Sequence, residues 1–104
     1  MAHKEKENYE KMKAAYRDKL EAKLREYRAD IDKMKAKADG AEAGARIEYY
    51  KQIEMLNAKL SSVEGKLLDL KSAGEEKWES AKAAVEHSWG DLKHSLKDAT
   101  SKIK

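Results

Sequence analysis

Cysteine, proline and phenylalanine are absent from this 104-residue sequence, and no segment is a long run of uncharged apolar residues. Without cysteine there is no disulfide framework and no thiolate chemistry, and so no reason to place the chain in an oxidising compartment. The first ten residues lack the apolar core of a signal peptide, and no stretch suits a transmembrane helix. We therefore expect a cytoplasmic protein.

Large apolar side chains are also few, because alanine is the commonest residue in the 40% counted as hydrophobic. A thick globular core is therefore excluded. Charged residues make up 41% of the chain, and together with alanine and leucine they give a composition typical of long helices and coiled coils. The expected fold is all-α, a single helical coiled-coil domain over residues 1–104, with burial confined to seams between helices.

The net charge of +3 is small against 23 basic and 20 acidic residues, and it lies wholly within residues 1–39. Acidic residues alternate with nearly all of the lysines, so no face carries one sign of charge. Such a pattern is typical of a solvated helix surface and makes nucleic-acid binding an unlikely function.

The last third of the chain, residues 67–104, repeats every 11 residues. Eleven residues make about three turns at 3.67 residues per turn, so equivalent positions stay on nearly one side of an α-helix. The repeat predicts a helix over about 75–103. Its amphipathic face is formed by Trp78, Val85, Trp89, Leu92, Leu96 and Ile103.

A second apolar stripe, with steps of three and four residues, predicts an amphipathic helix near the start of the chain. Opposite charges recur on its other faces at helical spacing, for example Glu21 with Arg25 and Arg28 with Asp32. We interpret the tyrosines of the stripe as seam residues whose hydroxyls reach water, rather than as a platform for bases. The stripe comprises Tyr9, Met12, Tyr16, Leu20, Tyr27, Ile31 and Met34.

Between these stripes lies a coiled-coil heptad whose steps alternate between three and four residues. Its branched side chains make the strongest seam of the sequence, namely Ile53, Leu56, Leu60, Val63, Leu67 and Leu70. At 72–75 the seam meets Gly74 where it needs a large residue, and two glutamates follow, which favours a new helix N-terminus. We expect the main turn there.

Residues 39–45 are the one other place where the chain could turn. Asp-Gly is a turn signal and glycine often follows a helix end. The apolar spacing nevertheless continues in phase, and two glycines cost a long helix only about 1 kcal/mol each. We favour one helix over about 4–72 with an antiparallel returning helix, which together form an elongated coiled-coil hairpin; the alternative is a three-helix bundle.

A hairpin of this shape would leave the stripe from Tyr9 to Met34 in water, because the returning helix covers less than half of the long one. An exposed stripe of that length implies self-association. We therefore expect a homo-oligomer, an antiparallel dimer, whereas the three-helix alternative would be monomeric.

No sequence signature of catalysis or of cofactor binding is present, so we expect a non-enzymatic protein without a cofactor. His87, Asp91 and His94 are spaced so that they share one side of a helix, which zinc or nickel could use. They lie opposite the apolar face and have no fourth ligand. We interpret them as surface residues and regard metal binding as the weaker hypothesis.

The amphipathic face of the last helix also fits a membrane surface. Lys82 and Lys93 border that face, where their aliphatic stems could lie along a lipid interface. The competing interpretation is that the same face is buried between helices. We favour burial, because the chain has two apolar stripes that need partners.

Two segments suggest a family. The run IEYYKQIEMLNAKL (47–60) and the run GEEKWESAKAAVEHSWGDLKHSLKDA (74–99) resemble the small bacterial coiled-coil stress-response proteins. The resemblance implies a soluble bacterial helical protein linked to stress, with no catalytic residues to transfer. This sequence departs from the pattern at Gly40 and Gly44.

The expected function is therefore a self-associating coiled-coil protein that binds or shields other macromolecules during stress. A scaffold for one protein partner is compatible with the same features. A peripheral membrane protein that uses its last helix is the alternative.

Overall fold

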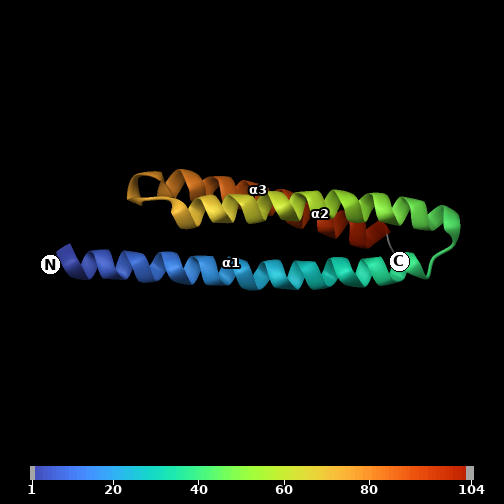
Figure 1. Cartoon of the computed structure of the whole chain (residues 1–104), viewed down its shortest axis with the longest axis horizontal. Helices are drawn as coiled ribbons and strands as arrows, with labels where there is room; N and C mark the ends of the chain where they lie inside the picture. The colour runs from blue at the N-terminus through green and yellow to red at the C-terminus, as the bar shows by residue number, and fades with distance from the viewer. Residues whose placement is uncertain (1, 103–104) are drawn as a thin grey trace.

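The computed structural model describes the backbone of residues 2–102 and the side chains of residues 8–102, and all elements in that range are α-helices. The helices are α1 (Ala2–Asp39), α2 (Ala43–Ser72) and α3 (Glu75–Lys102). They lie side by side along the longest dimension of a molecule that measures 64 × 19 × 18 Å (Figure 1). The predicted all-α class is confirmed for the described residues.

The continuous helix that the sequence favoured over about 4–72 is wrong, because α1 ends at Asp39 and α2 begins at Ala43. The backbone N–H of Ala41 donates to the carbonyl of Ala38 at 3.1 Å, which tightens the end of α1. The Arg46 guanidinium donates to the Ala41 carbonyl at 3.0 Å, and the Tyr50 hydroxyl donates to the Asp39 carboxylate. These contacts fix the path of the chain between the two helices.

The turn has a simple physical reason. Residues 39–45 carry no large apolar side chain, so a continued helix would bury nothing there, whereas a turn lets the α1 stripe pack on α2 and α3. Gly40 does not have a positive φ, so the turn uses its poor helix propensity rather than its access to left-handed backbone. The apolar positions before and after residues 39–45 keep the same helical spacing, which is compatible with a continuous helix or with a turn.

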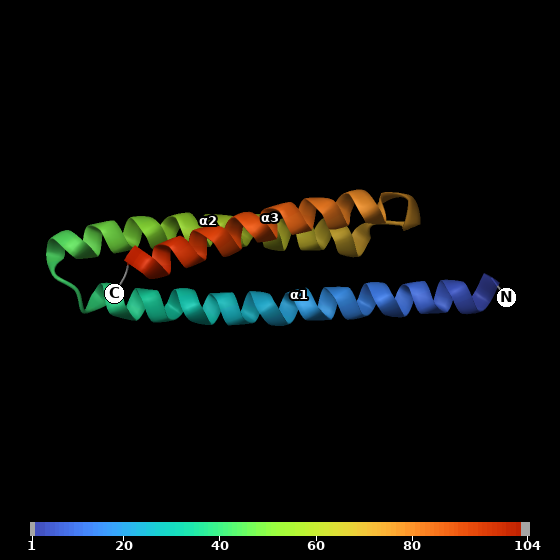
Figure 2. The same ribbon diagram turned by 180° about the vertical axis from the view of Figure 1, so that it is seen from behind.

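The second turn falls where the sequence indicated one, because α2 ends at Ser72 and α3 begins at Glu75. The N–H of Ala73 donates to the Leu70 carbonyl at 3.2 Å, and the N–H of Lys77 donates to the Gly74 carbonyl at 3.0 Å. α3 therefore returns antiparallel to α2 (Figure 2).

All three helices contribute to one apolar core. The whole heptad of α2 is buried, as are Trp78, Val85, Leu92 and Leu96 of α3. From α1 the buried side chains are Leu20, Leu24, Ile31, Met34 and Ala38. The stripe that a hairpin would have left in water thus packs against the other two helices of the same chain.

Met12 is the predicted seam residue that the structure does not bury, since 59% of it is exposed. Tyr9 and Lys13 contact Trp78 of α3, so at this level of α1 it is Lys13 rather than its neighbour Met12 that faces α3. Tyr9, Tyr16 and Tyr27 are partly buried against the core. Ile103 lies outside the described residues.

Candidate interaction surfaces

Aromatic rings gather where α1 meets the start of α3. The centroid of the Trp78 ring lies 6.5 Å from that of Tyr9 and 6.0 Å from that of Tyr16, and both pairs meet edge to face. Such pairs add about 0.5–1.5 kcal/mol each beyond the area they bury. Trp78 itself is 4% exposed, so this aromatic cluster ties α1 to α3.

Lys13 is buried within the aromatic cluster, with only 8% of the residue exposed. Its Nζ lies 4.9 Å from the centroid of the Tyr9 ring and 5.3 Å from that of Trp78. The Glu10 carboxylate lies 3.2 Å from the same nitrogen. Two ring faces and a carboxylate thus compensate the cation for the water it loses. Lys13 was not among the predicted seam residues, although it lies four positions after Tyr9 and three before Tyr16, on the same side of the helix.

Tyr16 links α1 to the middle of α3. Its hydroxyl donates to the Glu86 carboxylate at 3.1 Å, and the Lys82 Nζ lies 5.2 Å from the centroid of its ring. Burial, followed by the bond to Glu86, raises the pKa of Tyr16 to about 12.

Trp89 is also held by α1. Its ring stacks on that of Tyr27 with centroids 4.8 Å apart and planes 17° apart. Burial, followed by the charges of Asp30 and Glu26, raises the pKa of Tyr27. The tyrosines of the α1 stripe are thus paired with the tryptophans of α3.

A groove between α1 and α2 encloses about 320 Å³. Leu24 and Leu67 are its buried apolar residues, and Leu68, which is 63% exposed, stands at its edge. Ion pairs cross it from helix to helix, Glu21 with Lys71 and Arg28 with Glu64, the latter at 2.7 Å. The predicted pairs Glu21–Arg25 and Arg28–Asp32 are replaced by these contacts, because the groove brings cation and carboxylate of different helices together.

The electrostatics of this groove oppose proton-transfer chemistry. The bond from Lys71 holds the pKa of the Glu21 carboxyl below its usual value, so the group stays ionised. A general acid needs the opposite shift, which an apolar pocket without a nearby cation would give.

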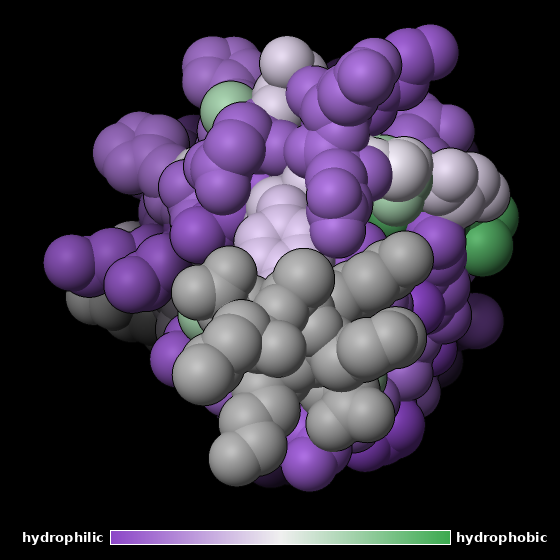
Figure 3. Space-filling model, turned by 90° about the vertical axis from the view of Figure 1, so that its left-hand side faces the viewer, coloured by the Kyte–Doolittle hydropathy of each residue, from purple (hydrophilic) through white to green (hydrophobic). Residues whose placement is uncertain are grey.

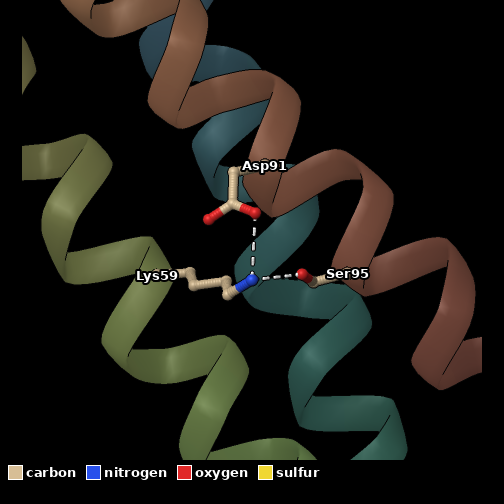
Figure 4. Close-up of polar contacts among 3 residues, drawn as sticks. All are labelled: Lys59, Asp91 and Ser95. Atoms are coloured by element: carbon tan, nitrogen blue, oxygen red, sulfur yellow. Dashed lines mark hydrogen bonds and ion pairs between the residues drawn. The ribbon is translucent and has the colours of Figure 1, made fainter.

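A polar contact joins α2 and α3 on the far side from this groove. The Lys59 ammonium donates to the Asp91 carboxylate at 3.0 Å and to the Ser95 hydroxyl at 2.6 Å (Figure 4). Ser95 is buried, so the bond to Lys59 compensates its hydroxyl for lost water.

The same contact bears on the metal hypothesis. Asp91 is one of the three candidate ligands, and its carboxylate is engaged by Lys59. His87 and His94 are both exposed. No group of three histidine or carboxylate side chains in the described part of the chain is arranged to hold a metal ion.

The amphipathic face of α3 points inward. Trp78, Val85, Leu92 and Leu96 are buried in the core, and Trp89 is partly buried. No helix in residues 2–102 is long and apolar enough to cross a bilayer. At the end where α1 begins, the described surface is mostly hydrophilic, with only small hydrophobic areas (Figure 3).

The other large apolar side chains that reach the surface are scattered. Besides Met12 and Leu68 they are Ile47, which is 60% exposed, and Met55, which is 39% exposed. They come from different parts of α1 and α2, so single apolar residues rather than one continuous patch face the solvent.

No family model, curated protein or solved structure matches this chain.

Proposed function

We propose that the protein is a non-enzymatic three-helix bundle that binds or shields other macromolecules through the outer side of α1. The link to stress is the expectation raised by the family resemblance. The observation that carries the proposal concerns α1, the longest helix. One side of α1 packs against the core, and its opposite side is exposed to solvent and contacts no other helix of the chain.

The lengths of the helices support this use of α1. It has 38 residues, against 30 in α2 and 28 in α3. Its side turned away from α2 and α3 is uncovered along the whole helix (Figures 1 and 2). Charged side chains on that side, including Lys11, Asp18 and Asp32, are exposed and form no ion pair with another described residue.

The chemistry of the rest of the surface supports a binding role rather than catalysis. The groove between α1 and α2 is spanned by paired charges, and the carboxylate of Glu21 is held ionised there. Surface charges of both signs favour contact with another mixed-charge protein surface over contact with a polyanion.

Aggregation of a heat-labile client enzyme tests this function. We expect light scattering from heated citrate synthase to fall when the chain is present in equimolar or greater amount, and lysozyme at the same concentration is the control. Scattering that matches the lysozyme control over the whole range of concentration would refute the shielding role.

The membrane alternative requires α3 to leave the bundle, because its apolar face is buried. With anionic phosphatidylglycerol vesicles, we expect tryptophan emission to stay unchanged. A vesicle-dependent shift that salt reverses, and that disappears in a folded Trp78→Ala/Trp89→Ala protein, would replace the proposal with lipid binding.

A further inference from the structure

The outer side of α1 carries a regular pattern of small and charged residues. Alanine recurs every seven residues at Ala15, Ala22, Ala29 and Ala36, and each is at least partly accessible to solvent. A seven-residue spacing drifts by only about 20° per repeat on a straight helix, so a second helix could follow it with a slight left-handed twist. Methyl side chains would let the two backbones approach closely.

Charges of alternating sign run beside the alanines with the same spacing. One edge of the stripe carries Lys11, Asp18, Arg25 and Asp32, of which Arg25 also lines the groove between α1 and α2, and the other edge carries Lys19 and Glu26. All six side chains are exposed, and none takes part in an ion pair among the described residues. Asp18 has no lysine or arginine three or four residues away in either direction, so α1 itself offers it no partner at helical spacing.

We propose that this side of α1 binds the same side of a second copy of the chain, antiparallel, with Ala22 opposite Ala22. The inference rests on the proposed use of the outer side of α1 and names its partner. In a two-fold symmetric antiparallel pair each edge faces the equivalent edge of the other copy. Asp18 then lies opposite Arg25 of the second copy, Lys11 opposite Asp32 of the second copy, and Lys19 opposite Glu26 of the second copy.

The signs of the charges select this register. Sliding the second copy by one heptad would again set alanine against alanine. It would, however, set Asp18 against Asp32 of the second copy, Arg25 against Arg25, and Lys19 against Lys33 of the second copy. These three are like-charge pairs, against one attractive pair, Lys11 with Asp39 of the second copy, so the balance opposes the shifted register. The register centred on Ala22 also overlaps α1 along nearly its full length.

Orientation follows from the helix dipoles. A parallel pair would also match opposite charges, Asp18 with Lys19 and Arg25 with Glu26 of the second copy, but it would place two positive helix ends together. The antiparallel pair sets each positive end beside a negative one. The α2 and α3 helices of each copy stay clear of the contact, because they lie on the other side of α1 (Figures 1 and 2).

Sedimentation equilibrium over a dilution series tests the pairing through a charge swap. We expect a dimer of twice the 11.8 kDa chain mass that dissociates on dilution. Asp18→Arg should raise the dissociation constant by about 10-fold, because two symmetry-related pairs change from attraction to repulsion. Asp18→Arg combined with Arg25→Asp should restore it, and Asp69→Arg on the exposed surface of α2 is the matched control.

The register is tested by single thiols, since the chain has no cysteine of its own. Ala22→Cys should form a disulfide-linked dimer on mild oxidation. Ala29→Cys should not, because the two thiols would lie about 20 Å apart along the helices. Equal cross-linking of both variants indicates a parallel pair and overturns the proposal.

The proposal is also overturned if the chain is a monomer throughout the dilution series, or if the double swap fails to restore the dimer. The client assay separates this failure from failure of the proposed function. A monomer that still suppresses aggregation refutes the pairing alone, whereas a dimer that does not suppress it refutes the shielding role alone.

Discussion

The contact between α2 and α3 and the packing of α1 on that pair use different kinds of residue. Leu56, Val63, Leu70, Val85 and Leu92 are the largest side chains that are completely buried, and all five belong to α2 or α3. α1 adds aliphatic residues to the core, but towards its N-terminus it is held by tyrosines, a buried lysine and ion pairs across a groove.

Because of this difference, the two contacts should respond differently to pH and salt. Burial of aliphatic side chains depends little on pH or salt, whereas exposed ion pairs and a tyrosine bonded to a carboxylate depend on both. The α2–α3 pair should therefore set the stability of the fold. The N-terminal half of α1 should be the part that responds to pH and to partners.

The largest expected effect is at the aliphatic seam. Leu60→Ala should destabilise the fold by roughly 2–5 kcal/mol, because Leu60 is 6% exposed and the substitution leaves a cavity. Met12→Ala, at an exposed site on α1, should cost less than about 0.5 kcal/mol. Urea denaturation of both variants measures the contrast, and equal losses would remove the distinction between the two regions.

The seam of α2 and most of the apolar face of α3 were predictable, because aliphatic residues at regular spacing have few alternatives to burial. The turn at 39–45 was not, since the apolar phase continues through it and the residues there are small. Met12 was predicted as a seam residue from spacing alone. Lys13 takes the position against Trp78 of α3 in its place, a contact that depends on the packing of two helices and that apolar spacing within α1 does not reveal.

The polar contacts were harder to predict than the apolar ones. Glu21 has an arginine four residues away in the sequence, yet it pairs with Lys71 on another helix. Lys13 occupies a seam position, but its burial depends on rings supplied by two helices. Such contacts depend on how the helices pack together. The sequence of α1 alone therefore predicts its amphipathic pattern but not these contacts.

A smaller effect is expected where the cation is buried. Lys13→Met keeps much of the side-chain volume and removes the charge, which should cost about 1–2 kcal/mol through loss of the cation–π contacts with Tyr9 and Trp78. Lys23→Met, at an exposed site on the same helix, is the control. If Lys13→Met proves as stable as the control in urea, the cation does not help to hold α1.

The contact of Tyr16 with Glu86 should make stability depend on alkaline pH. Because the folded-state pKa of about 12 lies above the ordinary value of 10.0, this stabilisation is complete below pH 10 and is lost as pH rises through about 12. Tyr16→Phe should cost about 0.5–1 kcal/mol at pH 8 through the lost hydrogen bond.

Lysines titrate in the same alkaline range, so the quantity to follow is the difference between the wild type and the Tyr16→Phe variant. That difference in unfolding free energy should shrink between pH 10 and 12. A difference that is constant over this interval would show that the hydroxyl of Tyr16 is not shielded in the folded protein.

The smallest expected effect concerns the exposed histidines of α3. His87→Ala combined with His94→Ala should leave the unfolding free energy within about 0.5 kcal/mol of the wild type. Isothermal titration with zinc or nickel is the second measurement. A stoichiometric isotherm that the double substitution abolishes would make these residues a metal site.

In this fold α1 turns back on α2 and α3 of its own chain, and a single distance can measure whether it does. Spin labels on Glu21→Cys and Lys71→Cys should lie within about 20 Å of each other, because the two native side chains form an ion pair. Dilution with unlabelled chain should not change that distance. A separation of about 75 Å, the length of 50 residues of continuous helix, would show that α1 and α2 form one helix. A short distance that disappears on dilution would show that α1 packs on another copy of the chain.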